Sequence, residues 1–426
     1  MKCIQKFQET YSREPDGLAF SPYRICPIGA HSDHNLGKIT GFAIDQGINI
    51  AYRPKQNGVV EMQSLQFPKR AQWHVASVPS VRQDDWADYL RGATLSLSPH
   101  YRLKVGLCGV IEGTLPIGGL SSSAAVTIAF LSALCRVNGI ELEAQELIDI
   151  AFHAERDYVG VSVGKLDQSC EVLGRKDHLL YLDTRDGSYE LIPVHPAMKP
   201  WRIAIFFSGL EHSLAGSKFN TRVDELKAGV YALQAFAGLD YGKFKETVAR
   251  QVPREVYETY KDRLPEPWRK RCEHWYTEFE RVEKGAEAWR RGDIEAYGRL
   301  SFSSGWSSIH NWESGAPEQI RLLRVCFLAS VQRQLIFFLF QEIRDFPDPF
   351  GIQRIEHCGG GLVVHTAAQL TAPAILFLQP GRPAIDFPGG DDVREIKTDG
   401  HHVLIRKISE LFDRQPFQQL PHICLN

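Results

Sequence analysis

The chain has 426 residues, of which 43% are hydrophobic and 23% charged, and its formal net charge is -2. A charge this close to zero gives no electrostatic reason to expect nucleic acid or a membrane surface as a partner. Nine scattered cysteines without a Cys-x-x-Cys pair favour reduced thiols over a disulfide scaffold or a zinc ribbon. No apolar run has the length of a membrane span or a signal-peptide core, so we expect a cytoplasmic monomer.

The length exceeds the size at which one hydrophobic core stops growing, which predicts two lobes that share a cleft. Periodicity and turn residues predict strands at 44–52, 59–67 and 103–112, helices at 121–138 and 143–159, strands at 179–182 and 203–207, and helices at 222–236 and 276–291. The turn at 54–58 is expected to join the first two strands as an antiparallel pair.

Mixed strands and helices come first and mostly helices follow, which indicates an α+β protein. Three prolines interrupt the periodicity between residues 190 and 200, at Pro193, Pro196 and Pro200. The expected domains are therefore residues 1–195 and residues 196–426.

A first cluster of chemically active side chains lies in the segment 23–34. Arg24, His31, Asp33 and His34 bring a cation, an anion and two imidazoles next to a hydrophobic strand, and Ala30 is an apolar gap among them. Charged and titratable groups are seldom fully buried unless they are paired, so the cluster indicates a site. A metal site at His31, Asp33 and His34 is one alternative at this point.

A second segment, 115–126, places a glycine turn and three hydroxyls directly before a predicted helix. Glycines let the backbone approach a ligand, and the first N–H groups of a helix attract anions. The candidate ligands to phosphate are Gly118, Gly119, Leu120, Ser121, Ser122, Ser123 and Ala124. An ordinary helix N-cap is the alternative, although three consecutive serines exceed what one cap needs.

Two carboxylates follow in the next predicted helix and the loop after it. Asp167 lies between apolar and polar neighbours, where a carboxylate can take a proton from a substrate hydroxyl. Glu155 offers oxygen ligands for Mg²⁺. The alternatives are a helix N-cap for Asp167 and a surface ion pair with Arg156 or Lys165 for Glu155.

The three segments in this order, Arg-x-x-x-x-Gly-x-His-x-Asp, Gly-Leu-Ser-Ser-Ser-Ala and Gly-x-x-Asp-Gln, resemble the GHMP small-molecule kinases and within them the galactokinase branch. Further matches lie at 86–92, 154–160 and 212–222, and the resemblance covers about residues 18 to 320. It implies a two-lobed fold with a ribosomal protein S5 domain 2-like N-terminal lobe, which holds the phosphate loop, and an α/β C-terminal lobe.

The resemblance also implies a reaction and roles for the residues. The C1 hydroxyl of a galactose-configured sugar would attack the γ-phosphate of ATP, with Arg24 stabilising the phosphoryl group and Asp167 as the base. Ala30, His31 and Asp33 would contact the sugar. The residues from Gly118 to Ala124 would bind ATP, and Ser122, Ser123 and Glu155 would hold Mg²⁺.

Ala30 bears on the choice of sugar. Galactokinases carry a Glu at this position, and its charge would cost on the order of several kcal/mol against a substrate carboxylate at C6. The motif around Ala30 is most like that of the galacturonokinases, which predicts D-galacturonate as the substrate and galacturonate 1-phosphate as the product. Candidate groups for the C6 carboxylate are Lys38, Lys165 and the backbone near Gly29. Phe219 stands where the galactokinase pattern has a Tyr.

Two alternatives remain open from the sequence, a galactokinase acting on D-galactose and a non-catalytic homologue that binds sugar and ATP. The second follows from the region beyond about residue 325, which is atypical: the expected Gly-rich third motif is replaced by 325–334. Gly359, Gly360 and Gly361 are a candidate displaced equivalent. Divergence and a reading-frame change in the source gene would both produce this pattern, and the second would predict an inactive protein.

Overall fold

The computed structural model describes residues 1–117, 119–201, 203–206, 218–240, 242–315, 317 and 320, and strands at 336–339, 355–358, 361–364, 374–377, 393–398 and 401–406. Contacts divide the chain into two units, Met1–Leu378 and Gln379–Asn426. In the second unit, β13 (Val393–Thr398) and β14 (His401–Arg406) form an antiparallel hairpin. The first unit contains the predicted site and has the predicted α+β character, while the predicted division near residue 195 stays a prediction.

A mixed sheet forms the centre of the first half of the chain. Its strands are β1 (Gly17–Ile25), β2 (Lys38–Lys55), β3 (Val59–Ser64), β4 (Ala71–His74), β5 (Gly106–Gly113), β6 (His178–Asp183) and β7 (Tyr189–Pro193). The order is β4-β3-β5-β2-β6-β7, and β1 pairs with β2. The long strand β2 therefore connects the segment that carries Arg24 to both halves of the sheet.

The predicted pairing of the first two strands is wrong, because β5 lies between them. β5 runs antiparallel to β2 and parallel to β3. Its residues from Gly106 to Ile111 are buried, as expected for a central strand whose two faces are covered. A Cβ at Gly106 would lie 2.1 Å from the Val59 carbonyl oxygen, so glycine permits the close approach of β5 to β3.

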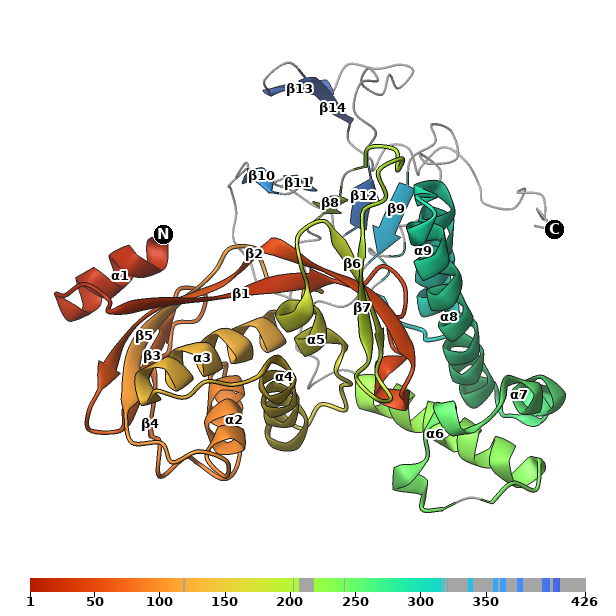
Figure 1. The fold of residues 1–426 in the computed structure, drawn as a ribbon, viewed down its shortest axis with the longest axis horizontal. Helices are drawn as coiled ribbons and strands as arrows, with labels where there is room; N and C mark the ends of the chain where they lie inside the picture. The colour runs from red at the N-terminus through yellow and green to blue at the C-terminus, as the bar shows by residue number, and fades with distance from the viewer. Residues whose placement is uncertain are drawn as a thin grey trace. The chain divides into compact units, whose positions relative to one another are not determined.

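Helices cover one face of this sheet, as Figure 1 shows for α2, α3, α4 and α5. The helices of this half are α1 (Lys2–Tyr11), α2 (Asp88–Leu97), α3 (Ser122–Asn138), α4 (Ala144–His153), the π-helix η2 (Ala154–Val159) and α5 (Leu166–Leu173), with the short helix η1 (Asp33–Asn35). The helix predicted at 121–138 is confirmed as α3. The helix predicted at 143–159 is confirmed as α4, which widens into η2 over its last residues.

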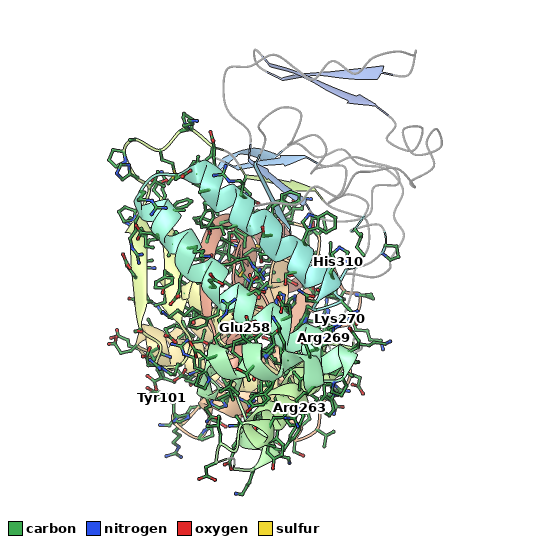
Figure 2. The ribbon with its side chains drawn as sticks, turned by 90° about the vertical axis from the view of Figure 1, so that its right-hand side faces the viewer. Tyr101, Glu258, Arg263, Arg269, Lys270 and His310 are labelled. Atoms are coloured by element: carbon green, nitrogen blue, oxygen red, sulfur yellow. The ribbon has the colours of Figure 1, made fainter. Side chains whose placement is uncertain are left out.

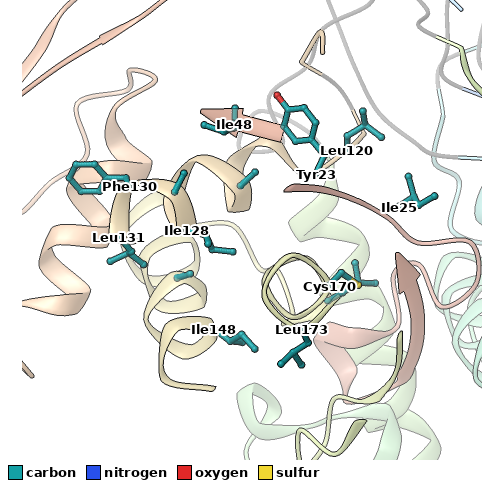
Figure 3. Close-up of a cluster of buried hydrophobic side chains, with 14 of the residues drawn as sticks. Tyr23, Ile25, Ile48, Leu120, Ile128, Phe130, Leu131, Ile148, Cys170 and Leu173 are labelled. Carbon is teal, nitrogen blue, oxygen red and sulfur yellow. The ribbon is translucent and has the colours of Figure 1, made fainter. Parts of the chain in front are cut away.

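The main hydrophobic core lies between this sheet and its helices. Figure 3 shows Ile128 and Leu131 of α3, Ile148 of α4 and Leu173 of α5 among the side chains that meet there. These side chains belong to one continuous core, in which α3 is buried on nearly every side and α4 packs against α3 and α5. The same core fixes where α3 and α5 begin, and both beginnings carry site residues.

The second half of the chain is mainly helical. Its helices are α6 (Phe219–Phe236), η4 (Phe244–Glu246), η5 (Ala249–Gln251), α7 (Arg254–Tyr260), η6 (Lys261–Arg263), α8 (Glu266–Arg290) and α9 (Ile294–His310). Figures 1 and 2 show α8 and α9 side by side, with Lys270 near the start of α8 and His310 at the end of α9. The predicted helices at 222–236 and 276–291 are confirmed as α6 and α8.

A second sheet has the order β10-β11-β8-β12-β9, from β8 (Ile203–Phe206), β9 (Ile336–Leu339), β10 (Ile355–Cys358), β11 (Gly361–Val364) and β12 (Ala374–Phe377). The strand predicted at 203–207 is confirmed as β8. Of the glycine triplet proposed as a displaced third motif, Gly361 begins β11, and Gly359 and Gly360 lie outside the described residues. Within the described part of the chain, no helix combines the length and apolar character needed to span a membrane.

Candidate active site

A cavity of about 700 Å³ opens within the first unit and collects most of the predicted site. Among the residues that line it are Arg24, Ala30, His31, Asp33, Gly119, Ser121, Ser122, Ser123 and Asp167. Leu120 and Ala124 are buried in the segment that carries Gly119 to Ser123, Glu155 is buried on η2, and Gly118 lies outside the described residues. Segments from β1, α3 and α5 therefore meet at one place although they are far apart in the sequence.

The loop that carries Ala30 and His31 is held by one turn of α8. The Glu278 carboxylate accepts the Gly29 N–H at 2.6 Å. The His274 ring lies 2.9 Å from the Ala30 carbonyl oxygen through Nε2, and the Trp275 indole N–H donates to the Ser32 carbonyl at 3.1 Å. We call His274, Trp275 and Glu278 the α8 clamp. Sequence reasoning missed it, although a His and a Glu four residues apart on one helix face were visible.

Electrostatics support this arrangement of the clamp. Burial lowers the pKa of His274, so the ring is neutral and can donate one N–H to the Ala30 carbonyl. Burial alone would raise the pKa of Glu278, but the Arg281 charge and hydrogen bonds from Ser304 and Gly29 hold it below its usual value. The loop backbone at Ala30 is thus fixed by buried, paired groups.

Arg24 and Asp167 form the central ion pair of the cavity. The Arg24 Nε donates to Asp167 Oδ1 at 2.7 Å, and its NH1 donates to the Gly119 carbonyl at 2.8 Å. The Ser121 hydroxyl donates to Asp167 Oδ2 at 2.7 Å. Asp167 is the second residue of α5 rather than its N-cap, so the alternative of a capping role is not what the structure shows. Although burial opposes the charge on Arg24, Asp167 raises the pKa of the guanidinium.

Asp33 lies beside this pair. Its Oδ2 accepts the Leu166 N–H at 3.1 Å, and a Cβ at Gly164 would lie 2.4 Å from the same oxygen. Burial, followed by the neighbouring Asp167 charge, raises the pKa of Asp33 to about 6. Asp33 is thus mainly a carboxylate at neutral pH, and it lines the cavity on the side of the loop that carries Ala30 and His31.

Glu155 fits a divalent cation better than a surface ion pair. It is 1% exposed, its Oε2 accepts from Gln168 at 3.0 Å, and its Oε1 has no hydrogen-bond partner among the described residues. Burial, followed by Asp167, raises the pKa of Glu155 to about 7, and the Ser123 hydroxyl opposes that rise. Lys165 pairs with Asp149 instead. One carboxylate and a serine suit Mg²⁺, which takes few protein ligands when phosphates supply the rest.

The phosphate loop leads into α3 as the sequence predicted. Gly119 and Ser121 have left-handed backbones, with φ of 63° at each, and Ser121 makes no side-chain capping bond to the helix. The first N–H groups of α3, at Ser122, Ser123 and Ala124, have no acceptor within the helix. Ser121 therefore occupies the N-cap position without the side-chain bond of an ordinary serine cap, and the free N–H groups of the helix start can bind an anion.

Glu171 is a buried acidic group that the sequence analysis did not consider. It lies one turn after Asp167 on α5 and is 5% exposed, and neither carboxyl oxygen has a hydrogen-bond partner among the described residues. Burial and then the Asp167 charge raise its pKa well above the usual value for Glu. The four-residue spacing from Asp167 was the available sequence signal.

Each of the three groups suggested for a C6 carboxylate has a partner elsewhere in the structure. Lys38 pairs with Glu283 at 2.9 Å, Lys165 pairs with Asp149, and the Gly29 N–H is bound by Glu278. The two lysines and Gly29 are absent from the described lining of the cavity. Groups that do line it and can donate are His31 and hydroxyls of α9, among them Ser308.

The metal alternative for the first cluster has no geometric support. The His31 ring stacks on Trp312 at a centroid distance of 5.2 Å, and the His34 ring bonds the neighbouring Asn35 side chain. Among the described residues no group of three or more His, Cys, Asp or Glu side chains is arranged to hold a metal ion. Phe219 lines the cavity beside this aromatic group, its ring centroid 6.2 Å from that of His31.

Known families and proteins match both the sequence and the fold. The family described as GHMP kinases N terminal domain matches residues 88–175, and the galactokinase galactose-binding signature matches residues 5–54. The chain is 35% identical to galacturonokinase from Arabidopsis thaliana, over 73% of this chain and 78% of that protein. It is 31% identical to galactokinase from Roseiflexus sp. (strain RS-1), over 74% and 78% respectively.

Solved structures share the fold. Lactococcus lactis galactokinase complexed with galactose has a TM-score of 0.72 at 23% identity, covering 88% of this chain and 89% of that one. Methanococcus jannaschii mevalonate kinase has a TM-score of 0.53 at 14% identity, covering 85% and 90%. At these identities the likeness concerns the fold alone.

Proposed function

Because the chain belongs to the GHMP kinases and to their galactokinase branch, we propose that it transfers the γ-phosphoryl group of ATP to the C1 hydroxyl of D-galacturonate. Its relatives are kinases named for galacturonate and galactose, so the enzyme class is a sugar-1-kinase. The observation that carries the proposal is the Arg24–Asp167 pair, in one cavity with Ala30 and the start of α3.

The ion pair supports the chemistry of the transfer. As the C1 oxygen forms its bond to the γ-phosphorus and the bridging P–O bond to ADP breaks, the hydroxyl proton passes to an Asp167 oxygen. Each carboxylate oxygen has two acceptor sites, so Asp167 can accept this proton while Arg24 and Ser121 stay bound. The Arg24 charge lies where negative charge grows on the transferring group.

The nucleotide is assigned to the part of the cavity at the start of α3. The glycine turn and the N–H groups at the start of α3 support binding of the phosphates. Glu155, Ser122 and Ser123 would hold Mg²⁺, which when bound would neutralise charge on the phosphate oxygens. The unpartnered, buried Oε1 of Glu155 supports its part in this set.

The preference for galacturonate rests on position 30. Ala30 lines the cavity with no charge, and the α8 clamp fixes its backbone. A carboxylate substrate therefore meets no like charge there, and His31 and Ser308 are the donors proposed for it in place of Lys38, Lys165 and Gly29. Asp33 is proposed to accept bonds from ring hydroxyls.

The test is the identity of the product. With Mg-ATP and D-galacturonate, phosphorus NMR should show an anomeric phosphate ester and ADP in equal amounts. The Asp167→Asn variant should lose turnover by at least about 1000-fold while ATP binding, followed by calorimetry, is kept. ADP formation that does not depend on a sugar, or turnover that survives in Asp167→Asn, would contradict the proposed chemistry.

A further inference from the structure

Ser121 has an unusual backbone for a residue with a side chain. Its φ of 63° and ψ of 47° lie in the left-handed region, which residues other than glycine adopt uncommonly. Glycine would fit this turn without strain, as Gly119 does two residues earlier with the same φ. A serine held in such a conformation at a site indicates a use for its side chain.

The serine side chain makes one specific contact that a glycine could not make. Its hydroxyl donates to Asp167 Oδ2 at 2.7 Å, while Arg24 binds Oδ1 at the same distance. Ser121 is 8% exposed, so water competes little for this bond. The carboxylate of Asp167 is thus held at both oxygens, by groups from two different segments of the chain.

We propose that Ser121 is a positioning residue for the base: its hydroxyl fixes the rotamer of Asp167, and its role is not to bind phosphate. This inference rests on the proposed function, in which Asp167 accepts the proton of the C1 hydroxyl. It separates Ser121 from Ser122 and Ser123, which begin α3 and are assigned to the nucleotide side. The three consecutive serines would then have two different tasks.

The surroundings explain why the hydroxyl turns to Asp167. Glu171 is the other carboxyl near Ser121, but neither of its oxygens has a hydrogen-bond partner among the described residues, whereas Asp167 Oδ2 accepts the Ser121 hydroxyl at 2.7 Å. Asp33 and Glu155 also lie near Asp167, but Asp33 accepts a hydrogen bond from Leu166 and Glu155 accepts one from Gln168. Among these groups Asp167 is the one that Ser121 orients.

The experiment compares Ser121→Gly with Ser121→Ala. Both variants lack the hydroxyl, and only glycine relieves the left-handed backbone. We expect kcat to fall about 10- to 100-fold in both, because a hydrogen bond to a charged group is lost, with the KM for ATP unchanged within about twofold. Ser132→Ala on α3 is the matched control, since Ser132 is exposed and bonds only the Ile128 carbonyl; its kcat should match the wild type.

The possible outcomes separate the alternatives. If Ser121→Gly keeps the kcat of the wild type, Ser121 only forms the turn. If kcat is unchanged but the KM for ATP rises, Ser121 binds phosphate. Either result overturns the proposal. A second measurement needs no activity: a double-mutant cycle of Ser121→Gly with Asp167→Asn, followed by denaturant unfolding. We expect the two changes to be non-additive in unfolding free energy. Additive effects would overturn the proposal even if the proposed function itself failed.

Discussion

At the scale of single residues, the site is a group of acids arranged around one arginine. Arg24 faces Asp167 directly, and Asp33, Glu155 and Glu171 surround that pair. Burial is the main cause that raises the pKa of each of these three acids, and the neighbouring Asp167 charge raises it further. The protonation of the group therefore changes within the range of pH in which the protein can be studied.

Asp33 gives the first prediction. Its pKa of about 6 means that it becomes protonated as the pH falls through 6, and a protonated carboxyl has lost acceptor capacity for the ring hydroxyls. The KM for the sugar should rise up to about tenfold between pH 7 and pH 5, with the KM for ATP little changed. In Asp33→Asn the sugar KM should be high at both pH values. A wild-type sugar KM that stays constant over this range would refute the assignment.

Glu171 gives a prediction about stability. The pKa of Glu171 is higher in the folded than in the unfolded protein. The stability that its protonated carboxyl contributes is therefore complete below the usual pKa of Glu and is lost as the pH rises through the pKa of the folded protein. Glu171→Gln cannot ionise, so it should match the wild type in unfolding free energy at pH 4. It should exceed the wild type at pH 8, by at most about 1.4 kcal/mol per pH unit.

Denaturant unfolding at several pH values measures this difference. Glu141→Gln is the control, because Glu141 is exposed on the surface. The control should follow the wild type at every pH. If the difference in unfolding free energy between Glu171→Gln and the wild type is the same at every pH, the Glu171 carboxyl does not titrate as described.

At the scale of elements, the α8 clamp connects the helical half of the chain to the loop that carries Ala30 and His31. Glu278→Gln keeps the side-chain volume but replaces the charged carboxylate, which accepts hydrogen bonds from Gly29 and Ser304 and pairs with Arg281, by a neutral amide. The free energy of unfolding should therefore fall by about 2–4 kcal/mol. The loop should loosen, which raises the KM for the sugar and spares that for ATP. Glu283→Gln, at an exposed position of α8, is the control for both measurements.

The positions of the helices and strands in the sequence were largely predictable, whereas which elements pack side by side was not. Helices α4, α6 and α8 follow from apolar periodicity and amphipathic pattern, and α3 follows from its run of helix-forming residues after small ones. The place of β5 between β2 and β3 does not follow from local pattern, because pairing over about 50 residues depends on packing of the whole sheet. The α8 clamp escaped prediction for the same reason: its partners are far away in the sequence.

At the scale of the whole molecule, the site residues were predicted by motif and their contacts were not. Arg24, Asp33, Ser121 and Asp167 were each identified from the sequence, and the structure brings them together in one cavity. The sequence could not show that Ser121 bonds Asp167, since that depends on a left-handed turn and on where α5 begins. It also misjudged Lys38 and Lys165, because surface carboxylates pair with both.

The central claim is that an uncharged residue at position 30 selects an acidic sugar. The most direct test is the ratio of kcat/KM for D-galacturonate to kcat/KM for D-galactose. This ratio is measured with Mg-ATP in the wild type and in Ala30→Glu. The wild type should favour galacturonate by at least about tenfold, and Ala30→Glu should reverse the order, because its carboxylate repels C6 of the acid and accepts from the C6 hydroxyl of galactose. A wild-type preference for galactose, or a ratio that Ala30→Glu leaves unchanged, would contradict the account.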